Sequence, residues 1–265
     1  MSKYNWNASD YKQYSQAQQK WARELIKKLN LEGTEDVLDL GCGDGKVTAG
    51  IANRIYSGSV VGVDSSKSMI KLATKQYSAN KYPNLSFMVM DAVDLSFEEQ
   101  FDVVFSSAAL HWVKDHKPVV EGLYRSLKSG GKILLQMGGE GNAEVIRSVF
   151  GEIQADNEWQ QYFTDFEFPY GFLGIEEYRE LLVGSGFSIN RVELIKKDMQ
   201  HEGKSGLEGW IRTTWLPYTE RIPEEKREQF INTVSSRYIN RVPLDSHGKV
   251  HVAMVRIEVE AEKRP

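Results

Sequence analysis

The chain has 265 residues, of which 41% are hydrophobic and 26% are charged, and its formal net charge is −4. This composition is ordinary for a globular protein, and the acidic balance argues against a general nucleic-acid binder. The single cysteine, Cys42, excludes an intramolecular disulfide and suits a reducing compartment. The stretch 1–16 has no secretory signal, and no run of about 18 apolar residues predicts a membrane-spanning helix. We therefore expect a cytoplasmic protein.

Strand and helix patterns alternate through the first half of the chain. Apolar runs rich in β-branched residues predict strands at 35–40, 58–64, 85–91, 101–107 and 132–137. Apolar spacing of three and four residues predicts helices over 16–29, 46–56, 67–78 and from about 118 to the glycines at 130 and 131. This alternation is typical of βαβ units and predicts an α/β fold with a doubly wound, mostly parallel sheet.

The alternation breaks after residue 138. Two irregular stretches rich in aromatic residues follow, at 139–174 and 201–248. Around them, the patterns predict a helix over 175–187 and strands over 188–197 and 249–260. We predict a Rossmann-like core of 31–138, 175–200 and 249–260, a lid helix within 1–30, and a cap made by the two irregular stretches. In the alternative, these stretches only cover the edge of the sheet.

The stretch VLDLGCGDGK at 37–46 places three glycines between a predicted strand and a predicted helix. Such a loop exposes backbone N–H groups at a helix start and fits two ligands, a dinucleotide or S-adenosylmethionine. Lys46 occupies the position of the third glycine in the dinucleotide pattern G-x-G-x-x-G. Asp39 would repel a pyrophosphate and attract the ammonium of a methionine group. Asp64, at the end of the second strand, suits a ribose in either ligand.

Several further stretches resemble the successive motifs of class I S-adenosylmethionine-dependent methyltransferases across roughly residues 20–195. They are VLDLGCGDG, VVGVDSS, FMVMDAVDL, FDVVFSSAALHWV and LKSGGKILLQM. Beyond this core, GLEGWIRTTWLPYTERIPEEKREQFI resembles trans-aconitate methyltransferases, which methylate a carboxylate of a small polyacid. LHWVKDH is similar to juvenile-hormone-acid methyltransferases. The resemblance implies S-adenosyl-L-methionine as cofactor, S-adenosyl-L-homocysteine as product and a seven-stranded sheet.

The resemblance also implies a set of cofactor contacts. Tyr11, Tyr14 and Gln19 would close over the cofactor, Asp39 would hold its methionine end, and Asp64 its ribose. Asp91 would bind the adenine amino group, although its side chain could instead cap the next turn. The full set is Tyr11, Tyr14, Gln19, Asp39, Gly41, Cys42, Gly43, Gly45, Asp64, Ser65, Met69, Asp91, Ala92, Ser107, Ala108 and His111. We interpret the Cys42 thiol as a packing group, since neighbouring acids disfavour a thiolate.

The candidate catalytic residues are His111 and Arg212, and the candidate substrate contacts are Trp112, Trp210, Arg212 and Trp215. Arginine grips carboxylates with a planar pair of donors, so Arg212 is the main candidate, with Arg147 and Arg237 as rivals. Trp210 and Trp215 could instead be core residues of the cap. No histidine has the spacing of a metal ligand.

We predict O-methylation of a carboxylate on a small organic acid, with no nucleic-acid or membrane partner, by a monomer or weak homodimer. The alternatives are N- or C-methylation of a small molecule with the same cofactor, and a non-catalytic protein that binds S-adenosylmethionine. A nicotinamide-dependent oxidoreductase is disfavoured by Asp39 and Lys46.

Overall fold

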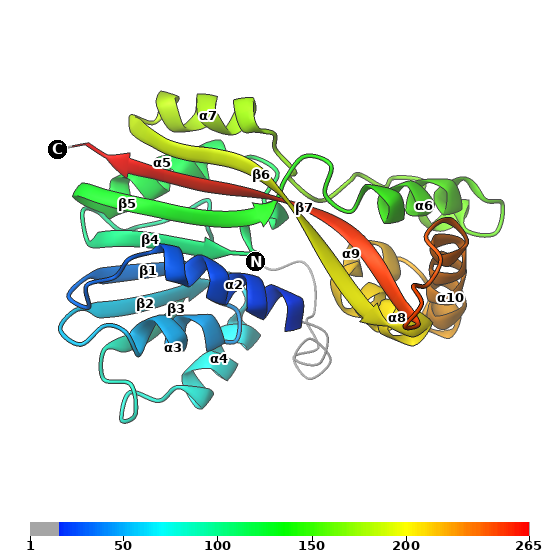
Figure 1. Ribbon diagram of the computed structural model, residues 1–265, viewed down its shortest axis with the longest axis horizontal. Helices are drawn as coiled ribbons and strands as arrows, with labels where there is room; N and C mark the ends of the chain where they lie inside the picture. Colours follow the sequence, from blue (N-terminus) through cyan, green and yellow to red (C-terminus); the bar gives the residue numbers. More distant parts are fainter. Residues whose placement is uncertain (1–15, 265) are drawn as a thin grey trace.

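A computed structural model describes residues 16–264, with side chains from Trp21 onward. These residues build one seven-stranded sheet in the order β3-β2-β1-β4-β5-β7-β6 (Figure 1). The strands are β1 (Asp36–Leu40), β2 (Ser59–Asp64), β3 (Leu85–Val89), β4 (Phe101–Ser107), β5 (Leu127–Gly138), β6 (Phe187–Glu202) and β7 (Lys249–Lys263). Strand β7 is antiparallel to both neighbours, whereas β1 to β5 pair in parallel. The predicted doubly wound, mostly parallel sheet is confirmed.

Helices cover both faces of the sheet. One apolar layer lies beneath α2 (Gln16–Lys28) and α3 (Lys46–Ala52), and α4 (Lys67–Gln76) packs along β2 and β3. The opposite layer lies beneath α5 (Lys117–Ser126) and α7 (Ile175–Gly184). Each helix buries one apolar stripe, as the spacing in the sequence predicts. The carboxyl ends of the parallel strands are left open at one edge.

Strands β6 and β7 continue beyond the sheet as a two-stranded ribbon. The last pair between β5 and β7 joins Gly138 to Arg256, while β6 and β7 stay paired as far as Glu202 and Lys249. We call the paired segments 196–202 and 249–255 the ribbon. At its far end the helices α6 (Glu144–Ala155), α8 (Gly203–Thr214), α9 (Leu216–Thr219) and α10 (Glu224–Arg241) gather beside it (Figure 1).

The helices at the end of the ribbon share one aromatic core, and we call residues 139–174 and 203–248 the helical unit. Its largest buried side chains include Phe150, Trp159, Trp210, Trp215, Tyr218 and Phe230. Phe150 stacks on Tyr218 with a ring-centroid distance of 4.1 Å. The two irregular stretches of the sequence therefore pack together, although the division into core, lid and cap stays a prediction.

The interpretation of 139–174 and 201–248 as irregular is wrong for both stretches. Helix α6 occupies Glu144–Ala155 in the first, and α8, α9 and α10 occupy most of the second. Helix α6 buries Ile146, Val149, Phe150 and Ile153, a helical spacing that the glycines at 138, 139 and 141 obscure in the sequence. Its first turn begins after Ala143, whose positive φ of 51° turns the chain.

The prediction that Gly130 and Gly131 end a helix is also wrong. Helix α5 ends at Ser126, and both glycines lie inside β5. The pairing of β4 with β5 steps from Phe101↔Leu127 to Val103↔Lys132, so the extra residues form an irregularity in the strand. Gly130 has a φ of +78°, the left-handed conformation that such a site requires.

His251 links the ribbon to the loop that precedes it. Its Nδ1 lies 2.8 Å from Asp198 Oδ2, and its Nε2 lies 3.1 Å from Asp245 Oδ2. Hydrogen bonds with Asp245 and Asp198 raise the pKa of His251 above its ordinary value of 6.5. A raised pKa means that the charged imidazole stabilises the fold below about pH 6.5, and that this contribution is lost as the pH rises through the folded-state pKa.

We therefore expect His251→Gln to lower the Tm more at about pH 6 than at about pH 9, as measured by thermal unfolding. The matched control is His247→Gln, because that side chain is 80% exposed and its Nδ1 lies 3.8 Å from Asp245 Oδ2, which is too far for a hydrogen bond. An equal loss of Tm at both pH values would contradict the assignment.

Candidate active site

A cavity of about 860 Å³ opens at the carboxyl ends of β1, β2 and β4. Its sheet side is formed by the turns that follow these strands and by the loop after β3. Its other side is formed by the helical unit, through Asp165, Phe166, Glu167, Pro169, Pro217, Glu220 and Arg221. Ala22 of α2 completes the wall. This position is the expected ligand site of an open α/β sheet.

The glycine loop closes tightly over the end of β2. The N–H groups of Gly41 and Cys42 donate to the carbonyl of Val63 at 2.8 and 3.0 Å. Gly41 has a φ of +78°, and a Cβ there would lie 2.1 Å from the Cβ of Ala109. A larger residue would therefore separate the loop from the turn after β4. Gly43 has open space at its Cβ position and lines the cavity with its backbone.

Gly45, the third glycine of the loop, serves packing rather than the cavity. A Cβ at this position would lie 2.7 Å from the ring of Phe87 and 2.9 Å from Ala73. Helix α3 begins directly after it, so the glycine lets the helix start close to its neighbours. Its predicted contact with the cofactor stays a prediction.

Asp39 lies on β1 beneath the loop and is 2% exposed. Its Oδ2 accepts a hydrogen bond of 2.7 Å from Thr48 Oγ1. Burial, together with the charge of Asp64, raises the pKa of Asp39 to about 7. The ionised form is therefore disfavoured in the cavity as it stands, and a cation placed beside it would restore the charge.

Asp64 ends β2 and is held by the backbone on both sides. Its Oδ2 accepts the Gly43 N–H at 3.0 Å, and its Oδ1 accepts the Ser66 N–H at 2.8 Å. Burial raises the pKa of Asp64, although these two bonds lower it in part. Ser65 and Met69 lie beside it on the cavity wall, and Ser66 caps α4. The carboxylate is therefore fixed in one orientation.

The loops after β3 and β4 form the rest of the sheet side. Asp91 and Ala92 line the cavity, and Asp91 Oδ1 also accepts the Val93 N–H at 3.3 Å. Asp91 therefore lines the cavity and also accepts a hydrogen bond within the next turn, so the two interpretations of this residue are compatible. Ser107 and Ala108 form the floor, where Ala108 has a φ of +59° and donates its N–H to the Gln136 carbonyl at 2.7 Å.

His111 lies behind the cavity wall rather than on it. The centroid of its ring lies 5.8 Å from that of Trp112 and 6.1 Å from those of Tyr170 and Phe172. Its Nδ1 has no hydrogen-bond partner among the described residues. Burial, followed by the charge of Arg256, holds the pKa of His111 well below its ordinary value. The imidazole is neutral at physiological pH, and of the three neighbouring rings only Trp112 lines the cavity.

The structure does not bring Arg212, Trp210 or Trp215 to this cavity. Arg212 forms a two-pronged pair with Glu228, at 3.0 Å from Nε and 2.8 Å from Nη2. Trp210 and Trp215 are 1% and 3% exposed in the aromatic core of the helical unit. Their contacts thus match the alternative in which they are core residues.

The other sequence candidates lie elsewhere as well. Arg237 pairs with Asp156 at 2.6 Å, and the Arg147 guanidinium lies 4.7 Å from the centroid of the Phe168 ring. Tyr11 and Tyr14, together with the side chain of Gln19, lie outside the described residues.

Two further cations, Lys114 and Arg221, line the cavity although no motif in the sequence singles them out. Lys114 pairs with Glu167 at 3.0 Å. Arg221 donates to the carbonyls of Tyr162 and Asp165, both at 3.3 Å, and its guanidinium lies 5.2 Å from the Phe166 ring. Among the described residues Arg221 has no carboxylate partner. Arg221 lies between Pro217 and Pro223 in the sequence. Prolines this close together indicate a turn, and this is the local signal for the position of Arg221.

Charges of both signs line the cavity. The sheet side carries four acids and one lysine, namely Asp39, Asp44, Asp64, Asp91 and Lys46. The opposite side carries Asp165, Glu167 and Glu220 together with Arg221, and Lys114 pairs with Glu167. Arg221 has no carboxylate partner among the described residues, so a molecule that fills the cavity would place a cationic group beside the sheet-side acids and an anionic group beside Arg221.

Cys42 lies between these acids and is 6% exposed. Burial, followed by the charges of Asp39 and Asp64, strongly raises the pKa of its thiol. The group stays protonated, which agrees with its interpretation as a packing side chain.

Within residues 16–264, no three or more His, Cys, Asp or Glu side chains are grouped in a way that could hold a metal ion. None of the helices described is both long and apolar enough to cross a bilayer.

A mostly parallel sheet of this strand order, with a glycine loop and an acid at the ends of its first two strands, defines the class I S-adenosylmethionine-dependent methyltransferases. Residues 38–135 match the family described as "Methyltransferase domain". An uncharacterized methyltransferase of Schizosaccharomyces pombe is 33% identical over 232 residues, which are 83% of this chain and 84% of the relative. The chain therefore belongs to this methyltransferase family.

Two further comparisons agree. The trans-aconitate 2-methyltransferase of Variovorax paradoxus is 26% identical over 270 residues, which cover 98% of this chain and 99% of the relative. The crystal structure of the YcgJ protein from Bacillus subtilis superposes with a TM-score of 0.65 at 20% identity and covers 93% of this chain and 99% of that one. The methyltransferase class and its fold are thus confirmed, and the class implies the use of S-adenosylmethionine.

Proposed function

We propose that the protein transfers a methyl group from S-adenosyl-L-methionine to a carboxylate of a small organic acid and releases S-adenosyl-L-homocysteine. The observation that carries this proposal is the position of Arg221, which lines the cavity opposite the sheet-side acids and has no carboxylate partner among the described residues. Full-length relatives named trans-aconitate 2-methyltransferase support the same substrate class.

The sheet side fits the cofactor in size and chemistry. A cavity of about 860 Å³ exceeds what a nucleoside with an amino-acid side chain fills, so a small acid also has room. Asp39 would hold the cationic methionine end, and Asp64 the ribose hydroxyls. Asp91 and Ala92 would bind the adenine, and Ser107 and Ala108 would lie beneath the sulfur.

The chemistry asks little of the protein beyond position and charge. Bound S-adenosylmethionine supplies a methyl group that its positive sulfur already activates. A carboxylate is ionised at neutral pH, so no general base is needed, and the neutral, buried His111 agrees with that. The cavity residues hold the acid in line with the methyl group and exclude water, which is worth about 7–11 kcal/mol in favourable cases.

Lys114 and Arg221 would orient the acid in place of Arg212. Backbone carbonyls and the Phe166 ring hold Arg221 in place, so its remaining N–H groups face a ligand with little loss of side-chain freedom. A second carboxylate on the substrate would reach these cations while the first receives the methyl group.

The direct test is a screen of small acids, including trans-aconitate and citrate, with cofactor labelled in its methyl group. We expect label in a product that base treatment releases as methanol, because methyl esters are base-labile. Label that survives base would indicate an N- or C-methyl product. Binding of the cofactor without any transfer would indicate a non-catalytic protein.

Arg221→Gln should raise the KM for the accepted acid about tenfold or more, since a lost charge-assisted hydrogen bond is worth about 1.5–3 kcal/mol. The affinity for S-adenosylhomocysteine should stay unchanged. Arg212→Gln is the matched control, because Arg212 pairs with Glu228 away from the cavity. Equal KM values in the two variants would remove Arg221 from the substrate site. The Tm of each variant shows whether the loss of the Arg221 hydrogen bonds to the 162–165 loop has also destabilised the fold.

Asp39 makes cofactor binding depend on pH. Because its pKa is raised to about 7, binding of a cation to the ionised form should weaken about tenfold from pH 8 to about pH 6. Asp39→Asn should bind weakly and without this pH dependence in calorimetry. The same variant should raise the Tm at about pH 8, since it removes a buried charge. A wild-type affinity that is flat with pH would contradict the role.

A further inference from the structure

The cavity has a third wall, and a cluster of charged side chains contacts the helix that forms this wall. Helix α2 contributes Ala22 to the cavity. Its Trp21 belongs to the aromatic core of the helical unit, while Leu25, Ile26 and Leu29 belong to the core beneath the sheet. One helix thus joins the helical unit, the sheet and the cofactor cavity, so its position affects all three.

Strand β7 runs beneath this junction, and one row of its side chains changes character along it. Val250, Val252 and Met254 pack into the helical unit. Two residues further, the Arg256 guanidinium lies 5.4 Å from the Trp21 ring, and two residues beyond that lies Glu258. Side chains at every second position of a strand share a face. This row is apolar where it packs against the helical unit and charged where it packs against α2.

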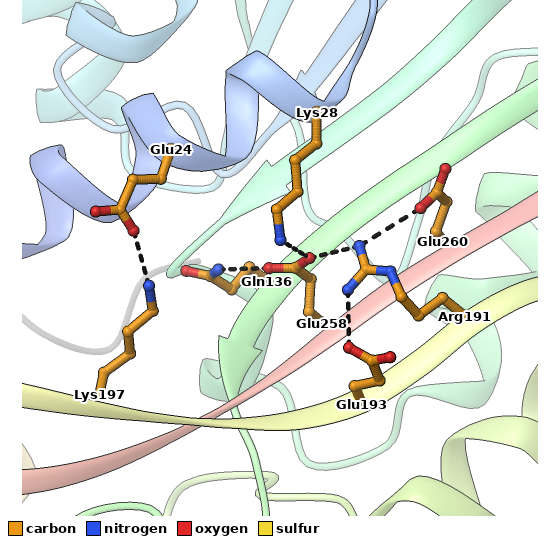
Figure 2. Close-up of polar contacts among 8 residues, drawn as sticks. All are labelled: Glu24, Lys28, Gln136, Arg191, Glu193, Lys197, Glu258 and Glu260. Carbon is orange, nitrogen blue, oxygen red and sulfur yellow. Dashed lines mark hydrogen bonds and ion pairs between the residues drawn. The ribbon is translucent and has the colours of Figure 1, made fainter.

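Glu258 is the centre of the cluster shown in Figure 2. Its side chain is 1% exposed and accepts from Lys28 Nζ at 2.5 Å, from Gln136 Nε2 at 3.0 Å and from an Arg191 nitrogen at 2.5 Å. Burial alone would raise the pKa of Glu258, but these three donors lower it below its ordinary value. The carboxylate is therefore charged, and the cation from α2 is one of its partners.

A second contact fixes the same side of the helix. Glu24, one turn before Lys28, pairs with Lys197 of the ribbon at 2.7 Å (Figure 2). The two contacts lie along one edge of the buried stripe of α2 and connect the helix to β7 and to β6. Rotation or sliding of the helix would break both contacts at once.

We propose that Lys28 and Glu258 are positioning residues, which act through α2 to set the affinity of the cavity for the cofactor. This inference rests on the cofactor-binding part of the proposed function. Lys28 is 45% exposed, and without it Glu258 keeps Gln136 and Arg191. The removal of Lys28 therefore takes away one of the two ion pairs described for the helix and leaves Glu258 with two partners.

The test compares Lys28→Met with Lys27→Met, its exposed neighbour on the same helix. We expect Lys28→Met to raise the Kd of S-adenosylhomocysteine about three- to tenfold in calorimetry, with kcat at saturating cofactor within about twofold of wild type. Amide exchange in α2 should accelerate by a similar factor. Lys27→Met should change neither quantity, and Lys28→Arg should restore both.

An unchanged Kd in Lys28→Met, with wild-type heat of binding, would overturn this inference and leave the proposed function intact. Exchange in α2 that matches wild type would also overturn it, because the ion pair would then not hold the helix. A wild-type protein that gives no heat with S-adenosylhomocysteine would contradict the proposed function itself. The exchange measurement needs no cofactor and would still report whether Lys28 docks the helix.

Discussion

The antiparallel pairing of β6 with β7 is the constraint on which the rest of the structure depends. Fifteen residue pairs join the two strands, from Phe187↔Lys263 to Glu202↔Lys249. Less than half of this length is supported by β5. The remainder projects as a ribbon and fixes the helical unit opposite the carboxyl ends of the parallel strands. Without the ribbon the sheet would keep its open edge, but the helical unit would not form the opposite side of the cavity.

In the proposed function the cavity has two tasks. Its sheet side binds the cofactor, and its opposite side binds the acid. The sheet side concentrates carboxylates, and burial raises the pKa of both Asp39 and Asp64, which is unfavourable for the protein alone. Such strain is typical of sites that wait for a charge of the opposite sign. The opposite side carries Arg221 beside several acids, and in the proposed function this arginine binds the acid next to the activated methyl group.

The sheet and the glycine loop could be predicted from the sequence because their signals are local. Apolar runs such as 58–64 end at turn residues, and the glycines at 41, 43 and 45 follow a strand directly. The placement of Arg212 and Arg221 could not be predicted in this way. Arg212 pairs with Glu228 on another helix. Arg221 lies at the cavity because the short helix α9, which follows Trp215, turns the chain. Such contacts depend on how helices pack, which no local pattern states.

The helical unit is assembled from two stretches that are separated by residues 175–202, which form α7 and β6. Phe150 of the first stretch stacks on Tyr218 of the second, and Trp159 packs against Phe230. The buried hydrophobic side chains of both stretches belong to one shared apolar core. A chimera that exchanges only one of them with a relative would leave half of an aromatic interface mismatched, so grafts intended to alter substrate range must transplant both stretches as a matched pair.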